Sequence, residues 1–263
     1  MSYSFYDLQD FAGDAGEIEA DRRLAEASLS HAPHSVPNAA PAIPRYLEEV
    51  YWWAYVHPNA VRVFERQWLV NAILWGNYPR LRDCALEALG ERLTGTTLQI
   101  ACAYGDITNQ LCERISAASG RLDIVDVAPV QLENLRNKLP ADAPARRLLM
   151  DSAALDIPAA SYDRAILFFL LHEQPEAWRR NTLAEAMRVV RPGGRVVIVD
   201  YARPRWWNPM RYLFAPVLRK LEPFALDLWK REIAAWLPEP WASRKIERRT
   251  FFGGLYQQIT LEC

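Results

Sequence analysis

A regular alternation of strand-like and helix-like segments, running from residue 97 to residue 201, most constrains how this chain can fold. Short apolar runs are expected to form strands, and the amphipathic stretches between them helices. The expected strands are 98–102, 121–127, 146–150, 162–170 and 195–201, and the expected helices between them are 108–116, 129–138 and 178–190. Such alternation predicts a parallel sheet whose ligand lies at the carboxyl ends of the strands. Residues 250–261, with Gly253 and Gly254, are expected to close the sheet as an antiparallel hairpin.

The loop after the first strand has the position of a nucleotide-binding loop but lacks most of its glycines. A loop that binds S-adenosylmethionine typically reads apolar, acidic, apolar and then Gly-x-Gly-x-Gly. Here Gln99 takes the acidic position, Ala101 and Ala103 take two glycine positions, and Gly105 takes the third. Each alanine thickens the wall beside the ligand, and Gln99 removes a fixed negative charge. Tyr104 places a phenol in this loop, where it either meets cofactor or substrate or fills a gap.

Acidic residues end the next two strands of the predicted sheet. Asp126, followed by Val127, stands where a carboxylate can bind both ribose hydroxyls of an adenosine cofactor. Asp151 and Ser152 follow the third strand, where a side-chain acceptor and backbone amides can recognise the adenine edge. The alternatives are a solvated carboxylate at the end of a strand and, for Asp151, a simple Asx turn.

The segment Arg191-Pro192-Gly193-Gly194 follows a helix and precedes a strand, and we interpret it as a structural turn. Its spacing from Asp126, Asp151 and the altered loop predicts an α/β fold of the class I S-adenosylmethionine-dependent methyltransferase type. That fold is Rossmann-like, with a mostly parallel sheet and a C-terminal antiparallel hairpin. The aromatic residues outside the alternating region predict a helical cap over the pocket.

His172 and Glu173 follow the apolar strand 162–170, where enzymes of this fold present residues to the substrate. An imidazole beside a carboxylate can transfer a proton or bind a divalent metal. We therefore treat His172, Glu173 and Tyr104 as candidate catalytic residues. In an alternative interpretation, His172 and Glu173 cap the next helix and pack under the cofactor.

Nine of the ten tryptophans lie outside the alternating region. We expect Trp68 and Trp75 to pack in the core between helices. Trp206 and Trp207 are interleaved with arginines, which is typical of a membrane interface where indoles sit at headgroup depth and cations meet anionic lipid.

Composition excludes several classes of protein. A net charge of −1 argues against a general nucleic-acid binder. The four cysteines form no CxxC pair, so neither a zinc site nor a disulfide framework is indicated, and a reducing compartment is expected. The sequence shows no signal peptide and no apolar run long enough to span a bilayer. We expect a cytoplasmic protein, peripherally associated with the inner face of the membrane.

The chain is expected to divide into five parts, which differ in composition. An acidic, proline-rich, partly disordered leader at 1–41 precedes an N-terminal helical cap at 42–95. The cofactor-binding core follows at 96–202. A helical insertion rich in Trp and Arg at 203–248 leads to the closing strands of the core at 249–263.

Several unusual strings make the chain, from about residue 42 to its end, resemble the rhodoquinone-biosynthesis methyltransferase-like family, RquA. The strings are Tyr51-Trp52-Trp53-Ala54-Tyr55 with His57-Pro58, Trp68-Leu69-Val70-Asn71 with Leu74-Trp75-Gly76-Asn77, Tyr104-Gly105-Asp106, Leu171-His172-Glu173-Gln174-Pro175-Glu176, Glu222-Pro223-Phe224 and Phe252-Gly253-Gly254-Leu255-Tyr256. The degenerate cofactor loop belongs to the same family pattern.

This resemblance implies that ubiquinone is converted to rhodoquinone, an amino group replacing a ring methoxy group. S-adenosylmethionine is then the amino donor, and the implied metal is a divalent ion, manganese, whose ligands the sequence does not identify. Two other hypotheses stay open: a conventional methyltransferase acting on a quinone or another lipophilic ring, and a non-catalytic protein of the same fold that binds lipid or acts as a scaffold.

Overall fold

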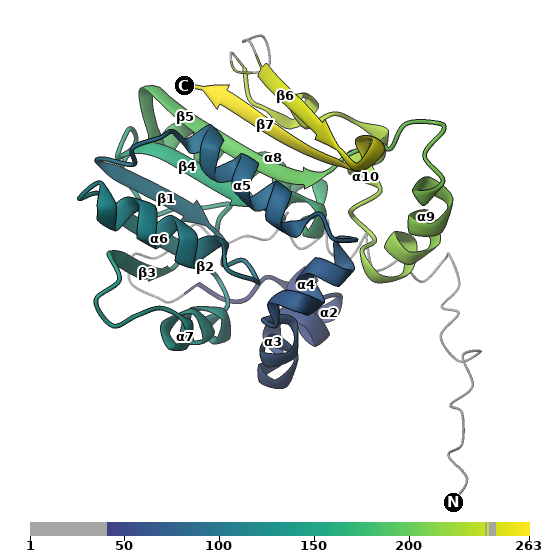
Figure 1. The fold of residues 1–263 in the computed structure, drawn as a ribbon, viewed down its shortest axis with the longest axis horizontal. Coiled ribbons are helices and arrows are strands. Elements are labelled where there is room, and N and C mark those ends of the chain that lie inside the picture. Colours follow the sequence, from purple (N-terminus) through teal and green to yellow (C-terminus); the bar gives the residue numbers. More distant parts are fainter. Residues whose placement is uncertain (1–40, 240, 242–245) are drawn as a thin grey trace, which may run out of the picture.

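A single seven-stranded sheet forms the centre of the protein in the computed structural model, which describes residues 41–239, 241 and 246–263 (Figure 1). The expected leader at 1–41 lies, apart from its last residue, outside the described residues. The strand order is β3-β2-β1-β4-β5-β7-β6, in which the first five strands are parallel and β7 is antiparallel to both of its neighbours. The strands are β1 (Thr96–Ile100), β2 (Arg121–Asp126), β3 (Ala145–Leu149), β4 (Tyr162–Phe168), β5 (Val190–Tyr201), β6 (Ile246–Phe251) and β7 (Tyr256–Glu262).

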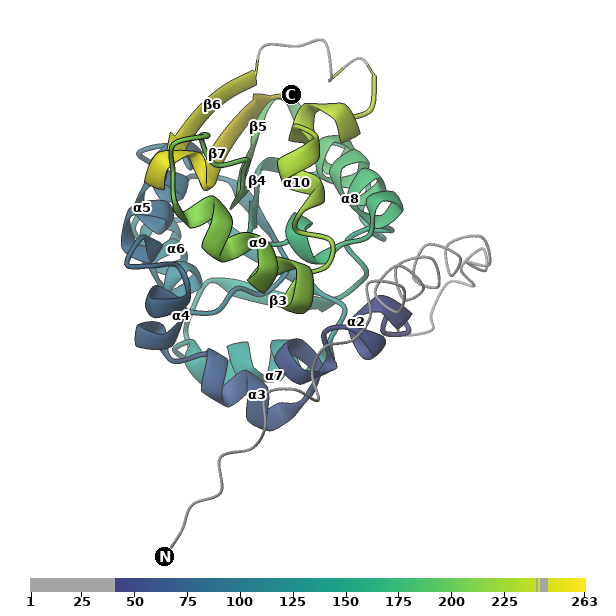
Figure 2. The ribbon, with the colours of Figure 1, turned by 90° about the vertical axis from the view of Figure 1, so that its right-hand side faces the viewer.

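Helices cover both faces of this sheet. Those that pack on the sheet are α5 (Tyr78–Leu89), α6 (Ile107–Ala117), α7 (Pro129–Lys138) and α8 (Glu176–Val189). The two views agree that α5 and α6 lie on one face and α8 on the other (Figures 1 and 2). Residues 196–199 of β5 are fully buried between these layers. Because both faces are covered, residues 165–168 of β4 and 196–199 of β5 are continuously apolar instead of alternating.

The expected turn at 191–194 is wrong in its details, because these residues already belong to β5. Gly193 has a φ of 76°, and its N–H donates to the Cys263 carbonyl (2.7 Å) on the neighbouring strand. The pairing of β4 with β5 shifts register at this point, between Tyr162 and Arg164. The glycines therefore form an irregularity inside a strand, a position that a strand tolerates when positive φ is available. The C-terminal antiparallel hairpin, formed by β6 and β7, is confirmed.

The remaining short helices gather at the end of the sheet where β1, β2 and β4 finish (Figure 2). They are α2 (Arg45–Glu49), the π-helix η3 (Trp52–Val56), α3 (Pro58–Phe64), α4 (Gln67–Ile73), η4 (Leu171–Glu173), α9 (Met210–Leu221), α10 (Asp227–Lys230), η5 (Ile233–Trp236) and η7 (Phe252–Gly254). Residues 65 and 66 divide the segment 58–73 into two helices, α3 and α4. The expected cap boundary at residue 95 includes α5, which packs on the sheet, and β6 begins at Ile246, before the expected 249.

The expectation that Trp68 and Trp75 pack in the core is wrong. The Trp68 side chain is 65% exposed and that of Trp75 is 48% exposed. Trp68 lies on α4, which contributes no buried residue although its sequence is largely apolar, and Trp75 lies beyond the end of that helix. Trp206 and Trp207 are exposed, as a surface role requires. Among the described residues, no helix is both long and apolar enough to cross a bilayer.

Candidate active site

The carboxyl ends of β1, β2 and β4 surround a small pocket of about 50 Å³. Five of the expected cofactor residues line it: Ala101, Asp126, Val127, Asp151 and Ser152. This is the point where the strand order reverses, β2 lying on one side of β1 and β4 on the other, and open α/β sheets bind ligands there. The sequence-based placement of the pocket at this edge therefore agrees with the geometry.

Both acidic residues of this pocket are held by backbone or indole N–H groups. Asp126 accepts from the N–H groups of Cys102 and Ala128, each at 2.8 Å. Asp151 accepts from Ala153 N (2.8 Å), which forms the Asx turn weighed above, and from Trp178 Nε1 (3.2 Å). Burial raises the pKa of each carboxyl, and these hydrogen bonds oppose the rise. The donors hold the two side chains in place beside the pocket.

The altered loop keeps a glycine-like backbone at one alanine. Ala101 has a φ of 69°, in the left-handed region that favours glycine. Gln99 lines neither this small pocket nor the larger cavity that lies beside it. Its Nε2 donates to the Ala101 carbonyl (3.0 Å), and its Oε1 accepts from Thr108 Oγ1 (3.1 Å). Gly105 does not line these cavities either. It packs against Tyr78, whose ring would lie only 2.5 Å from a Cβ at this position. Gln99 therefore shapes the loop from behind, where an acid would have placed a charge.

Tyr104 holds the loop to the N-terminal cap. Its hydroxyl donates to the Ala54 carbonyl in η3 (2.6 Å) and accepts from Gln131 Nε2 (2.8 Å). Its ring stacks on Tyr55 at 5.7 Å with an interplanar angle of 9°, and on Phe64 at 6.0 Å. Burial raises the pKa of Tyr104 far above its usual value. A phenol held neutral with both hydrogen-bonding functions occupied is suited to positioning η3.

A second, much larger cavity of about 680 Å³ lies beside the first, between the sheet edge and the cap helices. Ala103 and Tyr104 line it, together with apolar residues of α4 and α9. Its volume falls in the range of drug-sized ligand sites, and its walls are mostly aliphatic and aromatic. Four residues line both cavities: Tyr55, Cys102, Phe169 and Glu173. Two ligands, one in each cavity, would therefore both contact these four side chains.

His172 lies at the inner wall of the large cavity among three carboxyl groups. Its Nδ1 is 3.0 Å from Asp200 Oδ1, and its Nε2 is 3.7 Å from Glu173 Oε1 and 4.0 Å from Glu222 Oε2. Asp200 Oδ2 also accepts from the backbone N–H groups of Leu171 (2.8 Å) and His172 (3.3 Å). The group thus joins the end of β5, η4 and the segment after α9 around one imidazole.

The pKa values of these groups are shifted into the range where they exchange protons. Burial alone would lower the pKa of His172, but Asp200, Glu222 and Glu173 outweigh it and raise the pKa to about 9. Burial raises the pKa of Glu173 to about 8 and that of Glu222 to about 7, although the nearby imidazolium opposes both rises. Buried acids with raised pKa values beside a cavity are typical of proton-transfer sites.

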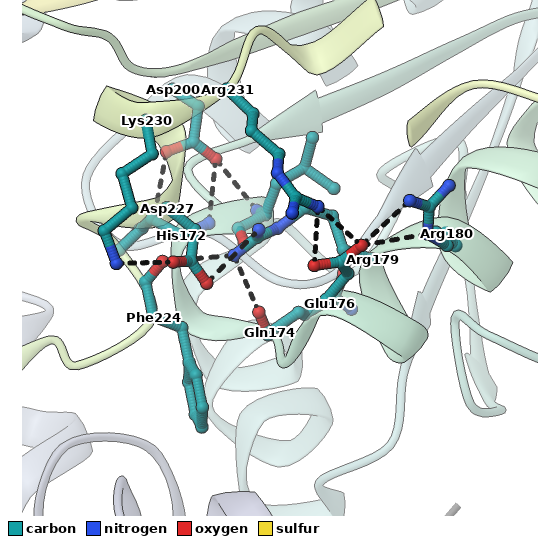
Figure 3. A network of polar contacts seen from close by, with 11 residues as sticks. His172, Gln174, Glu176, Arg179, Arg180, Asp200, Phe224, Asp227, Lys230 and Arg231 are labelled. Atoms are coloured by element: carbon teal, nitrogen blue, oxygen red, sulfur yellow. Dashed lines mark hydrogen bonds and ion pairs between the residues drawn. The ribbon is translucent and has the colours of Figure 1, made fainter. Parts of the chain in front are cut away.

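Arg179, on α8, holds the backbone on either side of His172 and Glu173 through hydrogen bonds, and Figure 3 shows it beside His172 and Gln174. The fully buried guanidinium donates to the carbonyls of Leu171 (2.9 Å), Gln174 (2.8 Å) and Phe224 (3.1 Å). Its Cζ also lies 4.5 Å from the centre of the Trp236 ring. Because three donors of one rigid fork are shared between η4 and the segment after α9, Arg179 sets the distance between them.

The described residues do not fit the expected manganese ion. Three carboxyl groups surround His172, with Glu173 Oε1 at 3.7 Å and Glu222 Oε2 at 4.0 Å from its Nε2, but no three His, Cys, Asp or Glu side chains among the described residues are grouped so that they could hold a metal.

Sequence reasoning missed several residues of this site. Asp200 is the last residue but one of β5, close to the strand end that Asp126 occupies in β2, so a similar strand-end signal was available. Glu222 belongs to a string that carries the family resemblance, but nothing in its surroundings marked it as a partner of His172. Phe169 and Arg179 gave no signal. Only the fold brings them to this site.

Comparison with known proteins supports this assignment of the fold. The profile of a family described as methyltransferase domain matches residues 97–194. The chain is 26% identical over 211 residues to a ubiquinone/menaquinone biosynthesis C-methyltransferase from Azotobacter vinelandii, covering 76% of this chain and 78% of that protein. A protein of the same description from Paracoccus denitrificans is 28% identical, covering 56% of this chain and 59% of the relative.

Solved structures show the same fold at low identity. An O-methyltransferase family protein from Burkholderia thailandensis has a TM-score of 0.59 at 16% identity, covering 95% of this chain and 72% of that chain. Human N-acetylserotonin methyltransferase in complex with SAM has a TM-score of 0.58 at 13% identity, and the match covers 94% of this chain and 65% of that chain. The expected fold is thereby confirmed: the protein has the Rossmann-like α/β fold of the class I S-adenosylmethionine-dependent methyltransferases.

Proposed function

We propose that this protein converts a ubiquinone-type quinone to rhodoquinone, with S-adenosylmethionine as the donor of the amino group. The observation that carries the proposal is the junction of the two cavities at Tyr55, Cys102, Phe169 and Glu173. A lipophilic ring in the large cavity would lie against a polar co-substrate in the small pocket. The likeness to quinone C-methyltransferases supports a quinone as the ring.

The reaction needs proton transfer at this junction. Two changes at the donor nitrogen are needed: it bonds to a ring carbon while the bond from that carbon to the methoxy oxygen breaks, and afterwards its bond to the donor's α-carbon breaks. In the second change the α-proton is lost, its electron pair reduces the quinone ring, and water hydrolyses the resulting imine to the aminohydroquinone and a 2-oxo acid. In the first change the proton released by the amine leaves with methoxide as methanol. Glu173, with a pKa raised to about 8, can accept and return that proton near neutral pH. The cationic His172 can donate a hydrogen bond to a quinone carbonyl oxygen and draw electron density from the ring. No step is assigned to a metal.

The altered loop supports amino transfer over methyl transfer. In a methyl-transferring pocket, an acid at position 99 would help to hold the ammonium group of the cofactor and keep it protonated. Gln99 is neutral and its amide is occupied by Ala101 and Thr108. A neutral amine is the form that can attack a ring carbon, so we infer that this loop presents the amine to the quinone.

Cofactor entry requires the cap to move. About 50 Å³ accommodates a few water molecules and no nucleoside. Tyr46, Leu47 and Tyr55, from α2 and η3, narrow the pocket, so these residues must shift when S-adenosylmethionine binds. Binding is therefore expected to change the packing of α2 and η3 against the sheet.

Mass spectrometry of the quinone product tests the proposal directly. The purified protein is incubated with ubiquinone and S-adenosylmethionine labelled at the α-nitrogen, with and without manganese. A lighter quinone that carries the label supports amino transfer. A heavier, unlabelled product would establish conventional methylation, the second candidate, which the likeness to quinone C-methyltransferases favours. Cofactor binding without any product would favour the non-catalytic alternative.

Gln99 offers a test of the role of the loop. Gln99→Asp restores the acid. Gln99→Asn is the matched control, because the asparagine side chain has the same length as that of aspartate and carries no charge. We expect Gln99→Asp to lower amino transfer well below the level of Gln99→Asn. Equal amino transfer by the two variants would refute the charge argument.

A further inference from the structure

The large cavity opens between α4 and α9, and its opening is lined by apolar side chains that remain exposed. Ile73 and Trp75 belong to the α4 side, and Leu213, Val217 and Leu221 to the α9 side. Each of these five side chains lines the cavity and is also more than two-fifths exposed. The Trp75 and Phe214 rings, 5.9 Å apart, join the two sides. We call these five residues, together with Trp68, the α4–α9 rim.

Helix α9 has two apolar faces, of which the core covers one. Phe214 and Leu218 are buried. Leu213, Val217 and Leu221 follow one another at a spacing of four residues, which places them in one stripe along the helix. This stripe has no protein partner that buries it within the described part of the chain. A second apolar stripe on a surface helix marks an interaction surface.

Helix α4 repeats this feature on the opposite side of the opening. Its sequence, Gln67–Ile73, contains five apolar residues, and none is buried. Trp68 is the most exposed of them. A helix of this composition normally buries one face. Leu69, Val70 and Ala72 line the large cavity, and Trp68 and Ile73 are exposed, so α4 offers apolar surface both to the cavity and outside it.

The two segments that carry the rim contain cations and no acid, and the acids that flank them, Glu65 and Glu222, face Lys138 (2.6 Å) and His172 (4.0 Å). From residue 202 to residue 221 the sequence contains Arg203, Arg205, Arg211, Arg219 and Lys220 and no acid. Residues 66–73 likewise contain Arg66 and no acid. The whole chain has a net charge of −1, so this concentration of cations is local. The exposed indoles of Trp206 and Trp207 lie in the same segment. Cations and indoles around an apolar surface match the headgroup layer of an anionic bilayer.

We propose that the α4–α9 rim docks on an anionic phospholipid bilayer and that a lipid tail enters the large cavity between α4 and α9. The apolar exposed surface and the cavity wall are continuous, so a chain leaving the bilayer need not cross water. Docking itself stands on the rim alone. Only the identity of the lipid as a quinone rests on the proposed function.

Vesicle binding tests the docking with two variants and a control. Trp68→Ser removes a rim side chain that does not line the cavity, and Arg219→Glu reverses one rim charge. Arg147→Glu reverses an exposed charge on β3, at the far edge of the sheet. Co-sedimentation uses vesicles of phosphatidylcholine with and without phosphatidylglycerol. We expect the wild type and Arg147→Glu to bind the anionic vesicles, with Arg219→Glu weaker by about tenfold and Trp68→Ser several-fold weaker.

Other outcomes overturn the proposal. Equal binding of all four proteins, or no binding by the wild type, would exclude the rim as a membrane surface. A dimer that sedimentation detects in the wild type and not in Trp68→Ser, without vesicle binding, would assign the rim to a second copy of the chain.

A short-tailed, water-soluble quinone assayed without vesicles separates this inference from the proposed function. Trp68→Ser should then react at the wild-type rate. Vesicle binding that depends on the rim, together with no amino transfer to this quinone, would refute the function and leave the docking intact.

Discussion

Replacing Tyr104 by phenylalanine tests whether this tyrosine positions the cap. The ring remains, so its stacking on Tyr55 and Phe64 is kept, and only the hydroxyl is lost. That hydroxyl makes two buried hydrogen bonds, to the Ala54 carbonyl (2.6 Å) and from Gln131 Nε2 (2.8 Å). Gln131 retains its bond to the Tyr55 carbonyl (3.1 Å), whereas the Ala54 carbonyl loses its side-chain donor.

At about 1 kcal/mol for each hydrogen bond, Tyr104→Phe should lower the free energy of unfolding by about 2 kcal/mol. For a chain of this size the melting temperature should fall by about 4–8 °C. Urea denaturation followed by tryptophan fluorescence measures the change. Tyr212→Phe is the matched control, because the Tyr212 side chain is 73% exposed. If Tyr104→Phe unfolds at the same urea concentration as the wild type, the hydroxyl does not hold the cap and our reasoning is refuted.

Three further predictions follow from strain, titration and burial. Ala101→Gly should raise the free energy of unfolding by about 1 kcal/mol, because glycine adopts a φ of 69° without strain; a lowered melting temperature in calorimetry would contradict this. In the folded protein the pKa is raised to about 7 for Glu222, about 8 for Glu173 and about 9 for His172. Their ordinary pKa values are 4.5 for each glutamate and 6.5 for the histidine. Folding therefore takes up protons between pH 4.5 and 9, and stability should fall as pH rises through this window; urea midpoints that stay constant from pH 5.5 to 9 would exclude it. Arg179→Lys cannot keep all three carbonyl bonds and should lower the free energy of unfolding by about 3 kcal/mol, whereas an unchanged urea midpoint would show that the fork is dispensable.

The parallel core could be predicted from sequence because its signals are local. Apolar runs of strand length alternate with amphipathic helices. Helix α7, for example, begins at Pro129, the residue at which the sequence predicts its start. The prediction failed where tertiary contacts decide. Trp68 and Trp75 have helical spacing, which identifies an apolar face but not whether the fold covers that face. In this protein the apolar face that carries Trp68 and Trp75 stays partly uncovered beside the large cavity.

Sequence position could place residues at the pocket only where they directly follow or end a strand. Asp126 and Asp151 do so and line the small pocket, and their role in binding a cofactor stays a prediction. The partners of His172 come from η4, from the end of β5 and from the segment after α9, which are far apart in sequence. No spacing along the chain links Glu222 to His172. Gln99 shows the opposite limit: its sequence position was noticed, but its bonds to Ala101 and Thr108 could not be derived from the sequence.

The loop after β1 and the cap that narrows the small pocket are held together by direct contacts. Tyr104 belongs to the loop, and its hydroxyl holds η3 through Ala54. Tyr55, on the same turn of η3, stacks on Tyr104 and lines both cavities. A ligand that displaces Tyr55 from the small pocket must therefore also disturb Tyr104 and the loop that would hold the cofactor. Occupation of the small pocket and the shape of the large cavity are consequently coupled, and by linkage a ligand of the large cavity that orders Tyr55 must alter the affinity of the small pocket for its own ligand.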